Sequence, residues 1–389
     1  MSARIQPSRR AVRYAVPVAI AGVAAATIGI GSAIAKSGDP DLPKISAQDL
    51  IAKVAGSDVQ RMSGSVRVTS DLGLPSLPAG MSFGTGGKGA HGGGSADPQA
   101  KLTELVSGTH TLRLAADGPD KQRVSIVERA AEYSLIHNGD QVWAYDSGTN
   151  TAYHSTQARH QDAGNAPAAA SPQELAKKAL AAVDDTTSVS VDGTAKVAGR
   201  DAYRLTIKPK QDATTIGAVR IAVDAKNGTP LRFTVSPKGG GKAALDAVFT
   251  KISFNKPSAS SFDFTPPKGA KVTEGKNEGK NEGKAKQHQR DAKGQHGDSR
   301  VIGKGWTSVM ELKGADKGIR PQAGKGGKDA SRANQLLDSF GSKVNGSFGS
   351  GRVISTRLVN VLLTDDGRVY AGAVDKDTLV KAADGNAGR

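Results

Sequence analysis

The chain has 389 residues, of which 37% are hydrophobic and 4% aromatic, with 48 glycines, 17 prolines and a net charge of +16. This length predicts two folded units, and the glycine and proline content indicates that part of the chain is linker rather than core. The absence of cysteine excludes disulfides, thiolate metal sites, a cysteine nucleophile and a lipid-modified cysteine. The positive charge is spread along the chain and is not concentrated on one element with stacking aromatic residues, which argues against nucleic acid as a partner.

Residues 1–35 have the features of an export signal. Four arginines and no acid precede an uncharged stretch at 14–35, and a cationic start followed by an apolar run directs the following chain across a membrane. Ala33-Ile34-Ala35 fits a small-x-small cleavage site, whereas the uncharged run is long enough to span a bilayer. A cleaved signal peptide would leave the protein secreted or periplasmic. A transmembrane anchor would hold it at the cell membrane with its bulk outside the cytoplasm.

Residues 36–272 are predicted to form the larger folded unit. A capped helix start is expected at Ser46, and a second at Ser171, where a proline and a glutamate complete the N-terminal signature. Alternating apolar and polar residues, separated by turn signals such as Asn-Gly, predict consecutive antiparallel strands. These strands are expected at 65–70, 109–115, 123–128, 132–137, 141–146, 151–155, 188–198, 202–209, 217–224, 231–236 and 247–254. Residues 72–98, rich in Gly and Pro, are expected to be a flexible insertion.

Residues 273–300 contain a polar Glu-Gly-Lys-Asn repeat and are predicted to be a disordered linker. Residues 301–389 are predicted to form a small C-terminal α+β unit. Its strands are expected at 306–312, 353–356, 358–363 and 369–374, and its helices near 334–340 and 375–383.

The motifs that could carry chemistry stand in unsuitable contexts. The Gly-Met-Ser-Phe-Gly segment around Ser82 matches a nucleophile elbow, but a proline and a glycine-rich loop flank it where a strand and a helix are needed. The seven histidines are scattered without metal-ligand spacing. The acidic pairs beginning at Asp184 and Asp365 are explained by capping and turn formation. We therefore predict no catalytic residue, no metal site and no cofactor, and a protein that is not an enzyme.

Apolar side chains alternate with polar ones along several predicted strands, so one face of the sheet is expected to be apolar. Two helices are too few to cover about ten strands, and the sheet therefore either closes on itself or leaves a cavity that a lipid chain can fill. For any single residue, ordinary core packing is the alternative explanation. The candidate hydrophobic ligand-binding residues are Leu112, Leu114, Val124, Ile126, Tyr133, Leu135, Trp143, Tyr145, Leu205, Ile207, Val219, Ile221, Val223, Phe233 and Val235.

Five short segments occur in a fixed order along residues 46–272. They are Gly-Ser-Val at 64–66, NGDQVWAYD at 138–146, VAGRDAYRL at 197–205, VDAKNGTPL at 223–231 and FDFTPP at 262–267. Each is a weak motif by itself, because turn chemistry explains part of it. Their combination and order resemble the LolA/RseB-like lipoprotein-localisation superfamily, with an extra C-terminal domain.

The resemblance implies an α+β fold, in which a strongly curved antiparallel β-sheet forms a half-barrel lidded by helices and accepts lipid acyl chains on its concave side. In that superfamily LolA carries lipoproteins through the periplasm, whereas RseB binds an anti-sigma factor. The chain is therefore expected to be an extracytoplasmic binder or carrier of lipid or acylated protein. The alternative is an RseB-like envelope regulatory module that binds an anti-sigma factor or another membrane protein.

Overall fold

The computed structural model describes residues 39–73, 105, 107–156, 171–274, 299–313 and 341–385. The predicted export segment at 1–35, nearly all of the predicted insertion at 72–98, most of the predicted linker and the helix expected near 334–340 lie outside these residues. In the described part of the chain, no helix is long and apolar enough to cross a membrane. Residues Asp39–Arg389 form one compact unit.

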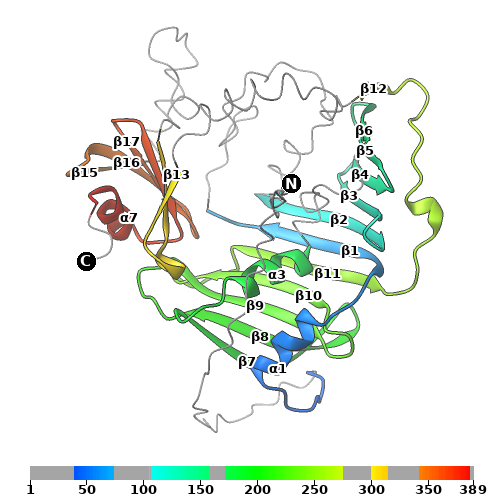
Figure 1. Ribbon diagram of the computed structural model, residues 1–389, viewed down its shortest axis with the longest axis horizontal. Helices are drawn as coiled ribbons and strands as arrows, with labels where there is room; N and C mark the ends of the chain where they lie inside the picture. The colour runs from blue at the N-terminus through cyan, green and yellow to red at the C-terminus, as the bar shows by residue number, and fades with distance from the viewer. Residues whose placement is uncertain are drawn as a thin grey trace, which may run out of the picture. The chain divides into compact units, whose positions relative to one another are not determined.

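A 12-stranded sheet forms the larger part of the fold (Figure 1), with the strand order β12-β6-β5-β4-β3-β2-β1-β11-β10-β9-β8-β7. Neighbouring strands are antiparallel except for β12, which pairs in parallel with β6. The sheet is curved and open, so the predicted α+β class with a half-barrel sheet is confirmed. Its strands are β1 (Arg61–Ser70), β2 (Gly108–Asp117), β3 (Lys121–Val127), β4 (Glu132–Asn138), β5 (Gln141–Asp146), β6 (Thr151–Thr156), β7 (Thr187–Val197), β8 (Arg200–Pro209), β9 (Ile216–Asp224), β10 (Pro230–Pro237), β11 (Leu245–Ser253) and β12 (Lys271–Glu274).

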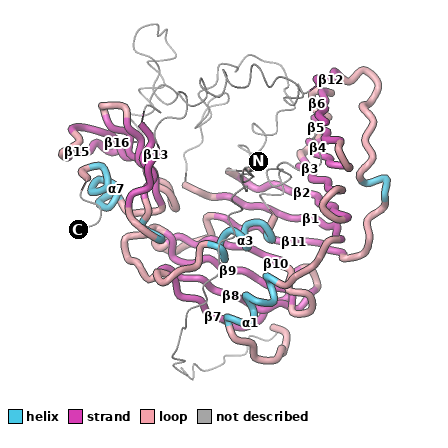
Figure 2. Tube along the Cα trace, viewed as in Figure 1, coloured by secondary structure: helices cyan, strands magenta, loops and turns pink. Residues whose placement is uncertain are grey.

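Two helices lie on one face of this sheet (Figure 2): α1 (Ala47–Ala55) packs against β7, and α3 (Pro172–Ala181) packs against β9, β10 and β11. Both begin where the sequence predicts. The Ser46 hydroxyl accepts a hydrogen bond from the Asp49 amide at 3.0 Å, and the Ser171 hydroxyl accepts one from the Glu174 amide at 3.3 Å. A short 3-10 helix, η3 (Ala259–Ser261), follows β11.

A smaller, six-stranded sheet has the order β13-β14-β18-β17-β16-β15. Helix α7 (Lys376–Ala383), capped by Asp375, packs on one face of it over a core that includes Val353, Leu362 and Leu379. The predicted C-terminal α+β unit therefore forms. Its strands are β13 (Ser299–Ile302), β14 (Val309–Lys313), β15 (Gly341–Gly346), β16 (Gly349–Ser355), β17 (Asn360–Thr364) and β18 (Arg368–Gly372).

The structure differs from the sequence prediction near the linker and in the C-terminal sheet, where strand β15 was not expected. The strand expected to begin at residue 306 begins only at Val309, because residues 305–307 form the 3-10 helix η5 (Gly305–Thr307). Strands β12 and β13 include residues of the segment predicted as linker. Their side chains are mostly exposed, and a strand at a sheet edge needs only backbone hydrogen bonds, so hydrophobic periodicity could not reveal them.

Two turn glycines offer a matched test of how closely α1 approaches the sheet. Gly228 and Gly199 both have positive φ, at 75° and 78°. A Cβ atom added to Gly228 would overlap the carbonyl oxygen of Lys53 at the end of α1, whereas a Cβ atom added to Gly199 would meet nothing within 4 Å. We expect Gly199→Ala to lower the free energy of unfolding by about 1 kcal/mol and Gly228→Ala by about 3 kcal/mol or more. Chemical denaturation of both variants measures the difference, and equal losses would contradict the close contact.

The core of the smaller sheet contains a phenol with a shifted titration. The Tyr370 hydroxyl donates to the Glu311 carboxylate at 3.1 Å, and burial together with this hydrogen bond raises the pKa of Tyr370 to about 12. Since the pKa in the folded state is above the value of about 10 in the unfolded state, this stabilisation is complete below pH 10 and is lost between pH 10 and 12. We expect the unfolding free energy to fall by up to about 3 kcal/mol across this window. Tyr370→Phe should show a smaller fall in the same denaturation series, and an unchanged pH profile would contradict the assignment.

Candidate functional site

One face of the 12-stranded sheet is apolar across most of its width. In the half formed by β7–β11, Leu205 pairs with Ile221 and Ile221 with Phe233. In the half formed by β1–β6, Leu112 pairs with Ile126. Side chains alternate between the two faces of a strand, and paired residues share a face. The residues of each of these two rows therefore lie on a single face of the sheet. Val66 of β1 is paired with both Leu112 and Phe249, and it joins the two rows. We call this continuous surface the apolar face.

The half of the apolar face on β7–β11 is covered by described elements. Leu50 and Val54 of α1 and Ala176 of α3 pack on it, and so does Leu358 from the turn between β16 and β17 of the smaller sheet. This burial indicates core packing, and a charge at the fully buried Ile221 would disrupt that core. The predicted ligand-binding residues in this half are Leu205, Ile207, Val219, Ile221, Val223, Phe233 and Val235.

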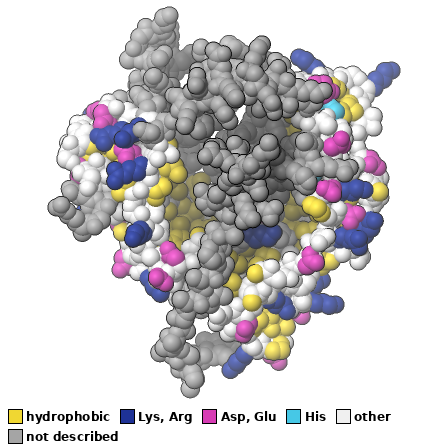
Figure 3. Space-filling model, viewed as in Figure 1, with side chains coloured by type: hydrophobic (Ala, Val, Ile, Leu, Met, Phe, Trp, Pro, Cys, Tyr) yellow, Lys and Arg dark blue, Asp and Glu magenta, His cyan; other side chains and the backbone are white. Residues whose placement is uncertain are grey.

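The other half of the apolar face extends over β1–β6. Among the described residues, only Leu105 and Leu175 come from outside the sheet's own strands and turns to pack here, and no helix lies over β2–β6. Figure 3 shows hydrophobic side chains towards the middle of the view, with most charged side chains nearer its margin. The predicted ligand-binding residues in this half are also buried, apart from the half-buried Leu114, and they are Leu112, Leu114, Val124, Ile126, Tyr133 and Leu135.

Trp143 and Tyr145 lie on the opposite face from the other predicted residues. Their neighbour Ala144 belongs to the apolar face, and alternation turns the two aromatic rings outward. Both rings contact Phe264, at centroid distances of 5.3 and 5.2 Å, and Trp143 stacks on His154 at 4.0 Å. The chain between β11 and β12 therefore packs across the outside of β5, and these two aromatic residues hold it there.

Four of the five sequence motifs behind the superfamily resemblance meet in two pairs. The NGDQVWAYD and FDFTPP segments contact each other through the aromatic rings just described and through a hydrogen bond from Asn138 to Asp263. The VAGRDAYRL and VDAKNGTPL segments are joined by an ion pair between Arg200 and the buried Asp224. The Asp224 carboxylate also accepts from the amides of Lys226 and Asn227, both at 2.9 Å. These motifs therefore build corners of the sheet.

The Asp224 corner has a defined electrostatic character. Burial alone would raise the pKa of Asp224, but the hydrogen bonds from Arg200 and from the turn amides lower the pKa below its ordinary value. The carboxylate is therefore charged at neutral pH and acts as a structural anion between two hairpins.

The two sheets meet through a polar joint. The Trp306 indole donates to the Thr187 hydroxyl at 2.9 Å, and the Trp306 amide donates to the Gln211 side chain at 2.8 Å. On the other side of the joint, Arg357 donates to the Asp71 carboxylate at 2.7 Å and to the carbonyl of Lys242. The sequence offered no signal for this joint, because it brings together turns that are distant along the chain.

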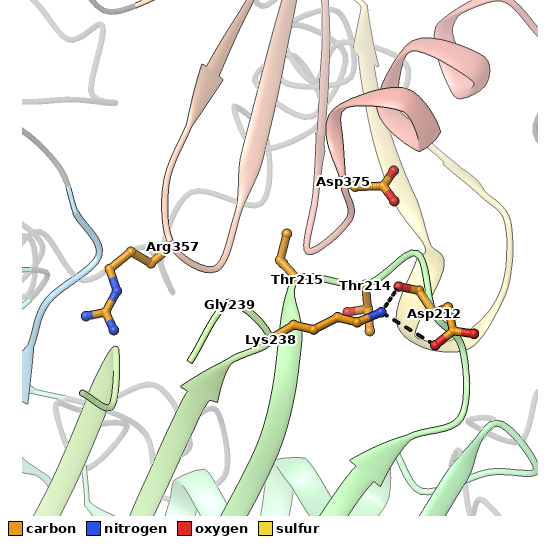
Figure 4. Close-up of a pocket in the computed structure, with 7 residues that line it drawn as sticks. All are labelled: Asp212, Thr214, Thr215, Lys238, Gly239, Arg357 and Asp375. Carbon is orange, nitrogen blue, oxygen red and sulfur yellow. Dashed lines mark hydrogen bonds and ion pairs between the residues drawn. The ribbon is translucent and has the colours of Figure 1, made fainter. Parts of the chain in front are cut away.

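A pocket of about 350 Å3 lies in this joint (Figure 4), lined by Asp212, Thr214, Thr215, Lys238, Gly239, Arg357 and Asp375. Its charged groups already have partners within the chain. Lys238 is hydrogen-bonded to Asp212, and Asp375 caps α7 by accepting from the Thr378 amide at 2.8 Å. The pocket therefore has the character of a structural contact between the sheets, with no charged group left to bind a ligand.

The described residues offer little for catalysis or metal binding. They contain no group of three His, Asp or Glu side chains that could hold a metal ion. A hydrogen bond from the Thr186 hydroxyl lowers the pKa of Asp184, and one from Arg368 lowers the pKa of Asp366. Local hydrogen bonds within turns therefore favour the charged form of both carboxylates. Ser82 and the linker histidines lie outside the described residues.

No protein-family model matches the chain, and no curated protein matches it. Among solved structures, it is similar to the Pseudomonas aeruginosa MucA/MucB complex, with 14% identity, a TM-score of 0.38 and coverage of 87% of this chain and 96% of that one. It is similar to an uncharacterised conserved protein from Thermus thermophilus, with 13% identity, a TM-score of 0.32 and coverage of 59% and 99%. It is also similar to a LolA superfamily protein from Nitrosomonas europaea, with 9% identity, a TM-score of 0.24 and coverage of 57% and 99%.

The resemblance to LolA/RseB-like proteins predicted from the motifs is confirmed at the level of the fold. The chain has the open, curved sheet with helices on one face that the resemblance implies. All three TM-scores lie below 0.5, so the function of this chain has to be inferred from its own residues.

The Arg200–Asp224 ion pair and the neighbouring Lys196–Asp201 pair differ mainly in burial. Asp224 is fully buried, whereas Lys196 and Asp201 are about half exposed. Replacing a buried partner leaves an uncompensated charge, so we expect Asp224→Asn to lower the unfolding free energy by about 3 kcal/mol. Asp201→Asn should change it by less than about 1 kcal/mol. Denaturant titration compares the two, and a small effect of Asp224→Asn would show that the motif corner does not stabilise the sheet.

Proposed function

We propose that this protein is a non-enzymatic, extracytoplasmic binder or carrier of lipid or acylated protein, and that the acyl chain lies on the part of the apolar face formed by β1–β6. The observation that carries the proposal is the unequal cover of the apolar face. Helices α1 and α3 pack over β7–β11, whereas no described helix lies over β2–β6.

The chemistry of this half of the face favours an alkyl chain as the ligand. Leu114, Val124 and Leu135 are aliphatic, and they form one row across three paired strands. Each methylene group moved from water onto such a surface contributes roughly 0.8 kcal/mol, so a chain of a dozen methylenes gains roughly 10 kcal/mol before entropic losses. Contacts of this kind recognise length and flexibility, and they need no catalytic group.

An extracytoplasmic location is supported by the sequence of residues 1–35, where four arginines precede an uncharged run. The superfamily resemblance adds support, since its members work in the cell envelope. A carrier would release its ligand to another protein, whereas an RseB-like module would keep a protein partner, and the ligand experiment below separates the two.

A substitution on β2 tests the ligand site. Leu114 lies half-buried on the apolar face, paired with Val124, whereas Thr111 of the same strand is exposed on the opposite face, paired with Arg67. We expect residues 39–389 to bind a fluorescent fatty acid and to gain thermal stability from it, because the ligand binds only the folded state. Leu114→Asp should weaken binding at least tenfold, since a carboxylate replaces apolar contact, and Thr111→Asp should leave it unchanged.

Two results would overturn the proposal. The first is the absence of both probe binding and thermal stabilisation with any long-chain lipid. The second is equal weakening by the two substitutions, which would place the probe elsewhere on the protein. If lipid binding is absent while a membrane protein co-purifies in stoichiometric amount, the regulatory alternative replaces the carrier.

A further inference from the structure

The face of the large sheet opposite to the apolar face carries a regular series of cations. Along one row of paired positions, Arg204 of β8 is followed by Ala222, Arg232, Val248 and then Arg67 of β1. An arginine therefore recurs on every second strand. Since neighbouring strands lie about 4.8 Å apart, these arginines are spaced about 10 Å apart along the row.

Three further cations lie on the same face, beside this row. Arg220 of β9 and Lys208 of β8 lie further along their strands, and Lys251 of β11 pairs with Ser65, which shares the outward face with Arg67. All three side chains are exposed, as are those of Arg67 and Arg232. We call the surface formed by Arg67, Arg204, Lys208, Arg220, Arg232 and Lys251 the basic face.

Intramolecular ion pairs neutralise only part of the basic face. Arg232 forms two hydrogen bonds of 2.8 Å with Asp246, and Arg204 lies 3.9 Å from Asp39. Arg220 donates to the neutral Ser236 hydroxyl at 3.2 Å. Across the described part of the chain, Arg67, Lys208, Arg220 and Lys251 form no ion pair, so the basic face keeps an excess of positive charge.

The arrangement of these cations indicates the kind of partner. On the strands that carry these cations, the aromatic side chains of Tyr203, Phe233 and Phe249 point to the apolar face, so no aromatic ring of these strands stands between the cations as a platform on which nucleic-acid bases could stack. Its cations are spaced singly along exposed strands and do not converge on a pocket. Such a pattern fits an extended anionic surface, where each cation meets a separate charge.

We propose that the basic face docks the protein onto an anionic lipid bilayer. In this orientation the apolar face points away from the headgroups. The proposal rests on the charge distribution of the sheet and does not depend on ligand binding at the apolar face.

The test uses residues 39–389, which form the compact unit, and vesicles of phosphatidylcholine with or without 30% phosphatidylglycerol. We expect binding to the anionic vesicles that weakens as salt rises, because salt screens exposed charges. Each cation close to an anionic bilayer changes partitioning by about fivefold. The triple variant Arg67→Glu, Arg220→Glu, Lys251→Glu should therefore bind at least about a hundredfold more weakly.

A second triple variant controls for net charge. Lys226→Glu, Lys343→Glu and Lys376→Glu change the net charge equally, and these exposed lysines lie in a turn of the large sheet and in the smaller unit. This variant should keep most of the vesicle binding, and thermal unfolding should show that both variants fold. Equal losses in the two variants, equal binding to neutral vesicles, or retention on soluble polyglutamate without vesicle binding would each overturn the proposal.

Discussion

The need to cover one continuous apolar face shapes this structure. A 12-stranded sheet that curves without closing leaves a wide row of aliphatic and aromatic side chains on one side, and each square ångström of that surface left in water costs about 25 cal/mol. Helices α1 and α3 and Leu358 of the smaller sheet cover the half formed by β7–β11. The half on β1–β6, over which no described helix packs, is the proposed ligand surface.

Polar and aromatic contacts away from the apolar face hold in place the elements that cover it. The buried Asp224 joins two hairpins close to α1, and the Trp306 and Arg357 contacts hold the smaller sheet where Leu358 can reach the apolar face. Around β5, the rings of Trp143 and Phe264 fasten the chain that leads from β11 to β12. The motifs that suggested a superfamily are thus the residues that fix the shape of the sheet, and the ligand surface itself is made of ordinary aliphatic positions.

A two-faced sheet also suggests a division of roles between its surfaces. The apolar face has the composition to bind an acyl chain, whereas the basic face has arginines on alternate strands, of which Arg67 forms no ion pair with a described residue. Because the same alternation of side chains creates both faces, the two properties follow from one strand pattern. Lipid binding and attraction to an anionic surface can therefore coexist without competing for residues.

The sequence by itself determined most strands of the large sheet, the capped starts of α1 and α3, the position of α7, and the hairpin turns, because periodicity, capping and turn chemistry are local. It also determined that an apolar face exists. Only the tertiary structure decided that Trp143 and Tyr145 lie on the opposite face, that Ile221 is core beneath helices, and that edge strands β12 and β13 form. Strand pairing, helix placement and the joint at Trp306 depend on contacts between segments far apart in sequence, which no local pattern encodes.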